Sequence, residues 1–302
     1  MPFERSQLRS KRHLRWAVVP VAAALIALLA GCSQEQLRGY LPGGPNVTNH
    51  TSGITGLWVN SWIVLLIVGV ITWGLVIWAA VAYRRRKGQT GLPVQLRYNL
   101  PIEIFYTIVP LILVLGFFAF TAKTQNDIEH VTQNPDVKIQ VYAKRWAWDF
   151  NYLDVGPGNK GVFAPGVQAV TLPKSNGEID KTKLPLLVLP VNKTIEIKLN
   201  SRDVDHSFWV PDFLYKKDTI PGKDNYMYFT PTKLGTYAGK CAELCGDYHS
   251  DMLFEVKVVT MEQFNGYIDF LAQNGQTGIL GPEYDTNSNL PGNTAPPSVE
   301  NK

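Results

Sequence analysis

Long runs of apolar residues are confined to the first part of the chain. One run occupies residues 57–83, and a second occupies residues 102–122, where Glu103 and a few uncharged polar residues interrupt it. Each run is long enough to cross a lipid bilayer as a tilted helix. The pattern therefore predicts two membrane-spanning helices, at 57–83 and at 101–123.

A basic cluster sets the direction in which these two helices run. The sequence Arg-Arg-Arg-Lys at 84–87 follows the first apolar run directly. Because positively charged loops stay on the cytoplasmic side, the first helix runs inward and the second returns the chain outward. We therefore expect a cytoplasmic loop at 84–100 and an extracytoplasmic position for the chain from residue 124 onwards.

A third apolar run lies near the start of the chain, at residues 16–30. Basic residues precede it, and the sequence Leu-Ala-Gly-Cys at 29–32 ends it. This order resembles the signal of bacterial lipoproteins. The resemblance implies that residues 1–31 are a signal peptide, that Cys32 receives a diacylglycerol, and that residues 32–56 form an extracytoplasmic segment. An uncleaved signal anchor with an incidental cysteine is the alternative.

The rest of the chain has the pattern of a β domain. Apolar and polar residues alternate at 137–141, 195–199 and 254–258. Alternation with a period of two is typical of antiparallel strands that bury one face. We therefore expect a β-sandwich at 124–272, with the Gly-, Pro- and Asn-rich segment 155–184 as a long excursion between strands.

The end of the β domain shows the signals of a helix followed by a flexible tail. Thr260 and Gln263 have the spacing of a capping box, and apolar residues behind them fall on one helical face. Residues 273–302 are rich in Gly, Asn, Pro and Ser, so we expect a flexible tail. We also hypothesise that the excursion 155–184 or this tail packs against a partner protein.

Charge and motif content argue against nucleic-acid binding and against a covalently attached haem. The net charge of +4 is carried in part by the N-terminal basic residues and by the cluster at 84–87, so it reflects membrane topology. We therefore expect no nucleic-acid partner. No Cys-x-x-Cys-His sequence occurs, so we expect no covalently attached haem.

A group of metal-ligating residues precedes the last predicted strand. Two thiols, an imidazole and a thioether occur close together, namely Cys241, Cys245, His249 and Met252. Such soft and borderline ligands suit copper and are poor ligands for magnesium or calcium. We expect His206 to join them from an earlier loop. Because two thiolates can bridge a pair of copper ions, the second cysteine favours a binuclear site over a mononuclear one.

The pattern Cys-x-Glu-x-Cys-x-x-x-His-x-x-Met, preceded by His-Ser-Phe-x-Val-Pro, resembles the binuclear copper (CuA) site of cytochrome c oxidase subunit II. The resemblance covers about residues 57–272, apart from the excursion 155–184, and leaves out the tail; it implies a cupredoxin-like sandwich behind a two-helix transmembrane hairpin. It implies that Cys241 and Cys245 bridge both coppers, with His206 on one and His249 on the other.

The same resemblance implies the remaining ligands. Met252 and the backbone carbonyl of Glu243 would complete the two copper coordination spheres. The side chain of Glu243 would reach a magnesium site shared with subunit I.

The family resemblance also implies a function and partners. The chain would be subunit II of an aa3-type cytochrome c oxidase in the plasma membrane, with oxidase subunits I and III as partners. It would accept electrons from cytochrome c, or from a cytochrome c domain of a bc complex. It would pass them to the haem centres of subunit I for oxygen reduction, in a complex that translocates protons.

Two further residues match functional positions of the family. Trp146 matches the tryptophan that serves as the electron port, although the family often has Gln before it and Tyr after it, where this chain has Arg145 and Ala147. Glu103 matches a glutamate at the entrance of a proton channel. A carboxylate in the first turn of a helix also stabilises the helix dipole, so both explanations of Glu103 remain open.

Other functions can be weighed against this one. A disulfide between Cys241 and Cys245 is the simplest alternative for an exported protein. A membrane-anchored copper carrier or copper-delivery protein is another, although delivery proteins resemble Cys-x-x-x-Cys-Pro, and Gly246 follows the second cysteine here. Nitrous oxide reductase shares the copper loop but lacks the two spans, and quinol oxidase subunits II lack the copper cysteines.

Overall fold

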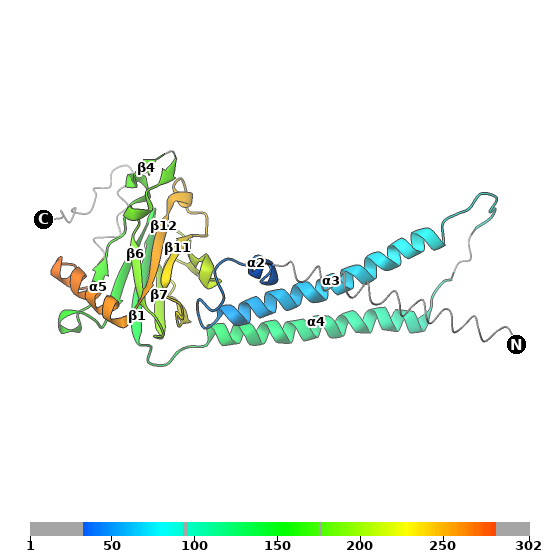
Figure 1. The fold of residues 1–302 in the computed structure, drawn as a ribbon, viewed down its shortest axis with the longest axis horizontal. Helices are drawn as coiled ribbons and strands as arrows, with labels where there is room; N and C mark the ends of the chain where they lie inside the picture. The colour runs from blue at the N-terminus through cyan, green and yellow to red at the C-terminus, as the bar shows by residue number, and fades with distance from the viewer. Residues whose placement is uncertain (1–32, 93–95, 176, 282–302) are drawn as a thin grey trace. The chain divides into compact units, whose positions relative to one another are not determined.

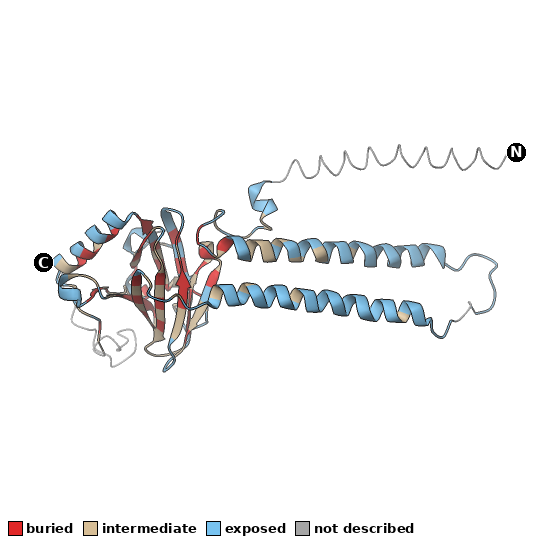
Figure 2. Cartoon of the chain, turned by 90° about the horizontal axis from the view of Figure 1, so that it is seen from below, coloured by how far each residue is buried: buried red, intermediate tan, exposed pale blue. Residues whose placement is uncertain are grey.

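The computed structural model describes residues 33–92, 96–175 and 177–281. A short helix, α2 (Gln34–Leu37), precedes two long helices, α3 (Thr51–Ala82) and α4 (Leu100–Glu129). Both long helices are apolar and long enough to cross a membrane. Figure 2 shows that most of their residues are exposed. Soluble proteins rarely expose so many apolar side chains together, so both helices are candidate membrane spans.

The two long helices extend beyond the apolar runs. α3 begins at Thr51, whose Oγ1 donates to the carbonyl of Thr48 at 2.8 Å. α4 begins after Asn99, whose side chain caps the helix, and it continues past residue 123 to Glu129. Hydropathy therefore locates each span but not the helix ends, since polar turns continue each helix outside the apolar stretch.

The strands form two five-stranded sheets (Figure 1). The first has the order β10-β7-β1-β2-β3. Its strands are β1 (Val137–Lys144), β2 (Ala147–Leu153), β3 (Val162–Ala164), β7 (Ile195–Ser201) and β10 (Asn225–Phe229). The second has the order β6-β12-β11-β8-β9. Its strands are β6 (Leu186–Pro190), β8 (His206–Val210), β9 (Tyr215–Thr219), β11 (Gly235–Cys241) and β12 (Leu253–Val259).

Strand direction differs in part from the sequence prediction. The pairs β1·β7 and β6·β12 are parallel, whereas the other strand pairs in these two sheets are antiparallel. The expectation of purely antiparallel sheets is therefore wrong. Each parallel pair joins strands that are far apart in the sequence, and such pairing is not encoded in the local alternation of residues.

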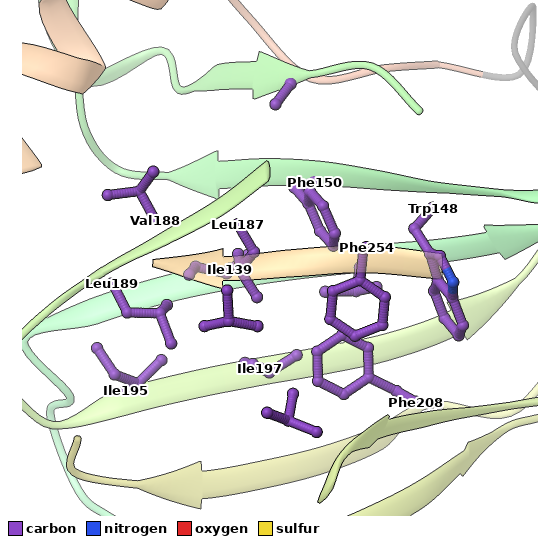
Figure 3. Packing of buried hydrophobic residues seen from close by; sticks show 14 of the residues in the cluster. Ile139, Trp148, Phe150, Leu187, Val188, Leu189, Ile195, Ile197, Phe208 and Phe254 are labelled. Carbon is purple, nitrogen blue, oxygen red and sulfur yellow. The ribbon is translucent and has the colours of Figure 1, made fainter. Parts of the chain in front are cut away.

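The core lies between the inner faces of the two sheets. Along β1 and β7 buried and partly buried residues alternate, as the pattern predicts. Aliphatic side chains such as Ile139 and Ile197 pack beside an aromatic group (Figure 3). In that group Phe208 stacks on Phe254 with ring centroids 4.7 Å apart, and Trp148 packs edge-on against both. These large, close-packed rings make this end of the sandwich rigid.

The excursion at 155–184 is more ordered than its composition indicates. Its first part contains β3, which pairs with β2 and extends the first sheet. Its second part contains a two-stranded hairpin, β4 (Lys174–Ser175) and β5 (Glu178–Ile179). It also contains the 3-10 turns η1 (Pro157–Asn159), η2 (Ala169–Thr171) and η3 (Lys181–Lys183). Short paired segments of this kind leave too little periodicity for recognition in the sequence.

The helix after the last strand is α5 (Met261–Gln273), and its predicted capping box between Thr260 and Gln263 is confirmed. Residues 274–281, which the sequence predicts as part of a flexible tail, contact the β domain. The carbonyl of Gln276 accepts a hydrogen bond from Phe163, and Leu280 is buried. Backbone pairing with the edge strand β3 therefore fixes the chain to residue 281. Residues 282–302 lie outside the described residues.

The segment before α3 and the end of α4 both contact the β domain. Val47 is fully buried in its core, and the backbone N–H of Asn49 donates to the carbonyl of Thr230 at 3.0 Å. At the end of α4, Glu129 forms an ion pair with Lys217 of β9. The chain thus leaves the β domain at the start of α3 and returns to it at the end of α4.

Candidate metal centre

Two strand ends and one loop bring the predicted copper ligands together. His206 is the first residue of β8, and Cys241 is the last residue of β11. These strands pair antiparallel with Cys241 opposite Phe208, so the register brings both ligands to one end of the sheet. The remaining ligands come from the loop between β11 and β12, which contains the 3-10 turn η5 (His249–Asp251).

The ligand atoms cluster around the two thiols. Sγ of Cys241 lies 3.9 Å from Sγ of Cys245 and 3.8 Å from Nδ1 of His206. Sγ of Cys245 lies 3.6 Å from Nδ1 of His249 and 3.9 Å from Sδ of Met252. Each thiol therefore has an imidazole of its own, and the two thiols lie between the two histidines.

This set of donors fits a pair of copper ions. The ligand atoms of His206, Cys241 and Cys245 lie within 4.8 Å of one another, and all three residues are buried. The backbone carbonyl of Glu243 lies 3.2 Å from Sγ of Cys241. Thiolate and imidazole ligands at this spacing suit copper. The two cysteines are free, and their sulfurs are much farther apart than the roughly 2 Å of a disulfide bond.

The two thiols differ in acidity because they share a hydrogen bond. The hydrogen bond from Cys245 lowers the pKa of Cys241 to about 3, and it outweighs the opposing effect of burial. The contacts with His206 and with the backbone of Glu243 act in the same direction. The same hydrogen bond, with burial, raises the pKa of Cys245. One thiolate therefore forms more readily than the other, and a bound cation would favour ionisation of the second.

Asp203 orients His206 from the side away from the thiols. Its Oδ1 lies 2.9 Å from Nε2 of His206, and its Oδ2 accepts from the backbone N–H of Arg145 at 2.7 Å. Burial acts to lower the pKa of His206, but the contacts with Asp203 and Cys241 raise it overall. Because Nε2 faces Asp203, Nδ1 is the nitrogen directed at the metal position.

Trp146 lies against the copper loop. Its Nε1 donates to the carbonyl of Cys245 at 3.2 Å, and its backbone N–H donates to Oε1 of Gln168 at 2.9 Å. Its ring packs edge-on against Tyr248, with centroids 5.0 Å apart. Only 6% of Trp146 is exposed. The predicted electron port therefore contacts a ligand residue directly, but it is covered by its neighbours.

The other predicted site residues lie in different surroundings. Oε1 of Glu103 accepts from the backbone N–H of Asn99 at 2.8 Å, so this carboxylate stabilises the start of α4. Glu243 is exposed, which leaves its carboxylate open to a partner. Cys32 lies outside the described residues.

Several residues that support the site were not predicted from the sequence. Asp203, Gln168 and Tyr248 contact ligands or Trp146, yet none belongs to the ligand pattern. Asp203 stands three residues before His206, and this proximity was the only signal for it.

Comparison with known proteins gives a consistent result. A family model described as cytochrome c oxidase subunit II, periplasmic domain, matches residues 137–259. A probable cytochrome c oxidase subunit 2 of Streptomyces avermitilis is 39% identical over 279 residues, which cover 86% of this chain and 87% of that protein. The cytochrome c oxidase subunit 2 of Mycobacterium bovis is 33% identical over 293 residues and covers 83% of this chain and 80% of its own length.

One solved structure similar to this chain is the periplasmic domain of subunit II of cytochrome oxidase of Bradyrhizobium japonicum. It is 28% identical and covers 47% of this chain and 98% of its own, with a TM-score of 0.40. The sequence relatives match over most of their length, and two apolar helices followed by a cupredoxin-like β domain agree with the fold class predicted from the sequence. The chain therefore belongs to the cytochrome c oxidase subunit II family and is a subunit of a haem-copper oxidase.

Proposed function

We propose that this subunit accepts electrons from a c-type cytochrome at a binuclear copper centre and passes them to the haem centres of subunit I. The observation that carries the proposal is the pair of free thiols 3.9 Å apart, each with an imidazole of its own. A copper pair bound there would supply a one-electron redox couple. The reaction of the whole complex, oxygen reduction with proton translocation, would take place in subunit I.

The protein residues of the site hold the ligands in one geometry. In this proposal Cys241 and Cys245 bridge the metals, with His206 on one and His249 on the other. Met252 and the carbonyl of Glu243, each within 4 Å of a thiol sulfur, would complete the set. Strand ends and a packed aromatic group support these residues, so they would hold the ligands in place when an electron arrives or leaves.

Electrons would reach the ligands through Trp146. Its hydrogen bond to the carbonyl of Cys245 joins the indole to the backbone of a bridging residue. The donor would be cytochrome c or a cytochrome c domain of a bc complex.

Two further assignments concern subunit I. The exposed carboxylate of Glu243 would bind a magnesium ion shared with that subunit, since carboxylate oxygen is a preferred magnesium ligand. Glu103 would stand at the entrance of a proton channel, although its contact with Asn99 also accounts for it as a helix-capping residue. Subunit III would be a second neighbour in the membrane.

The membrane arrangement that we propose has both helices crossing the plasma membrane and the β domain outside. The basic residues at 84–87 favour a cytoplasmic loop. The contacts of Val47 and Glu129 with the β domain support a chain that leaves the outer surface and returns to it. A lipid on Cys32 would add an anchor on the same side. Incorporation of labelled fatty acid should be lost in Cys32→Ser.

The copper assignment is tested by electron paramagnetic resonance of the full chain loaded with copper. An unpaired electron shared by two copper nuclei should give a hyperfine pattern with more lines than a single nucleus produces. Cys241→Ser and Cys245→Ser should each abolish this pattern, because a hydroxyl is a weakly acidic donor that does not replace a bridging thiolate.

The alternative in this test is a copper carrier or a copper-delivery protein. A single-copper spectrum in the wild-type chain would support that alternative and contradict the binuclear centre. Retention of two coppers per chain and full oxidase turnover in both serine variants would contradict the assignment of Cys241 and Cys245 as copper ligands. Cys32→Ser is the matched control, because this cysteine belongs to no proposed copper ligand set and the variant should keep the wild-type spectrum.

A further inference from the structure

Trp146 is not the outermost group of its own site. Its exposed fraction is only 6%, so a donor protein has little of the indole to contact. Tyr248 packs directly on the indole, with ring centroids 5.0 Å apart and an angle of 60° between the rings. Unlike Trp146, Tyr248 is partly exposed. The aromatic surface available to a donor at this position therefore includes Tyr248.

Tyr248 is held in place by the copper loop. It directly precedes His249 in the chain, and its carbonyl accepts from the backbone N–H of Asp251 at 3.0 Å. Its side chain packs against the hydrophobic core. Tyr248 thus has a through-space contact with Trp146 and a covalent connection to a proposed copper ligand.

The neighbouring loop residue permits this close packing. Gly246 has a φ of +117°, a conformation that other residues rarely adopt, and a Cβ at this position would lie 3.0 Å from Cζ2 of Trp146. The absence of a side chain at Gly246 therefore lets the indole lie against the loop, where Tyr248 covers it.

The sequence next to Trp146 cannot supply a second aromatic ring. Ala147 is buried, and a Cβ built on Gly166 would lie 3.0 Å from the Cβ of Ala147 and 2.6 Å from the carbonyl oxygen of Trp148. The backbone of the excursion thus passes close to position 147. The aromatic neighbour of Trp146 comes from the copper loop instead.

We propose that Tyr248 is part of the electron port. Its ring contacts the donor protein, and electrons pass from the donor through this ring to Trp146. This inference rests on the proposed function, in which Trp146 connects a donor to the copper ligands. A reduced c-type cytochrome loses one electron and the copper pair gains it. Neither aromatic side chain changes its oxidation state or releases a proton, because both act as the medium between donor and acceptor.

The test uses the assembled oxidase with Tyr248→Leu and Tyr248→Phe. The rate of reduction of the copper centre by reduced cytochrome c is measured by stopped flow. Tyr248→Leu should lower the second-order rate constant roughly tenfold or more, the size of effect expected when an aromatic anchor at an interface is truncated. Tyr248→Phe, which keeps the ring, should retain the wild-type rate constant. The copper spectrum and reduction potential should stay unchanged in both variants.

Tyr226→Leu serves as the control. This partly exposed tyrosine lies on edge strand β10, where it stacks on Tyr228, and the variant should react as the wild type does. An unchanged rate constant in Tyr248→Leu would overturn the inference. So would an altered copper spectrum in that variant, which would indicate structural support of the loop, or an equal loss in Tyr248→Phe, which would assign the effect to the hydroxyl.

The two proposals fail in different ways. Absence of a binuclear spectrum in the wild-type oxidase would refute the proposed function. A normal wild-type spectrum with an unchanged rate in Tyr248→Leu would refute the role of Tyr248 alone.

Discussion

At the scale of single residues, the copper ligands depend on neighbours that the ligand pattern does not contain. Asp203 contacts both His206 and the backbone of Arg145, so one carboxylate supports a proposed ligand and the residue next to Trp146. Mutation of partners of this kind typically costs about 10- to 100-fold in metal affinity or activity. They are therefore part of the site, although they bind no metal themselves.

Substitution of Met252 tests the ligand set with the least expected loss of copper. Met252→Leu should retain copper, because a thioether is a weak axial ligand and leucine fills a similar volume in this buried position. We expect a raised reduction potential and slower electron transfer, measured by redox titration of the copper absorption and by stopped flow. An unchanged potential would show that Met252 is not a ligand.

The sequence contains a signal for the proposed copper ligands but none for most of the residues that support them. The chemistry of two thiols, two imidazoles and a thioether singles out five of the six proposed ligand positions, because few other functions need that combination, whereas the carbonyl of Glu243 follows only from the family resemblance. Gln168 and Tyr248 have no such signature. Their roles arise from the folding of the excursion and the copper loop around Trp146, which brings together residues far apart in the sequence.

At the scale of elements, the start of β1 is joined to the turn before β7 by one carboxylate. Oδ2 of Asp136 accepts from both the backbone N–H and the hydroxyl of Thr194, each at 2.8 Å. The backbone N–H of Thr194 is the main cause that holds the pKa of Asp136 below its usual value. This contact lies next to the parallel pair β1·β7, whose partner strands are distant in sequence.

The lowered pKa of Asp136 predicts a pH-dependent contribution to stability. The ionised carboxylate stabilises the fold above its unfolded pKa of 3.8, and this contribution is lost as the pH falls through the lower folded value. Asp136→Asn should therefore reduce the free energy of unfolding at neutral pH by about 0.5–1 kcal/mol, a small effect because the site is exposed to solvent. Denaturant unfolding in detergent, followed by tryptophan fluorescence, measures it.

The difference between Asp136→Asn and the wild type should shrink as the pH falls below 3.8 and vanish once the pH is below the lowered pKa of Asp136, where both side chains are neutral. Asp154→Asn is the matched control. Its carboxylate forms an exposed ion pair with Lys138 at 3.4 Å, which should contribute less than the contacts of Asp136. A difference for Asp136→Asn that stays constant down to this pH would contradict the electrostatic explanation.

The structure changes what is expected of the excursion 155–184. From the sequence alone, removal of residues 157–182 should leave copper binding intact. The excursion contributes strand β3, and Gln168 holds the backbone of Trp146. Lys174 also forms an ion pair with Asp251 of the copper loop at 2.5 Å. We now expect that removal of 157–182 alters the copper spectrum.

A smaller deletion separates these contributions. Replacement of residues 174–179 by a short turn removes the ion pair with Asp251 but keeps β3 and Gln168. This variant should keep the wild-type copper content and spectrum, and it should lose at most about 1 kcal/mol of stability, as for a partly exposed ion pair. A wild-type spectrum after the larger deletion would show that the contacts of Gln168 and β3 are dispensable.

Element prediction succeeded where the local pattern determines the structure. Alternation at 137–141, 195–199 and 254–258 located β1, β7 and β12, because burial on one face imposes a period of two. β3 is too short to show a period, and the chain at 274–281 is fixed by pairing with that strand. Neither feature is visible in a short window of sequence.

At the scale of the whole molecule, membrane topology is the main expectation that remains to be tested. A protease added outside spheroplasts should cleave the outer domain at exposed sites, whereas the basic loop at 84–100 should stay protected. The reason is that the basic charge of this loop favours the cytoplasmic side, and the burial of Val47 in the β domain keeps the start of α3 on the same side as that domain. Immunoblots with an antibody against the outer domain would follow the cleavage.

Permeabilised spheroplasts provide the control for this experiment. Trypsin should then also cleave at the arginines of 84–87, which shows that the loop is susceptible once it is accessible. Protection of the outer domain in intact spheroplasts, with cleavage of the loop, would reverse the proposed orientation.

The buried position of Val47 affects the stability of the β domain when it is produced as a soluble fragment. A fragment that begins after α4 lacks this residue, which precedes α3 in the chain and belongs to the core of the β domain. The gap left by a side chain of this size should destabilise the fragment by about 1–3 kcal/mol. Joining residues 42–50 to residue 124 through a glycine-serine linker should restore the missing side chain and keep Glu129 opposite Lys217.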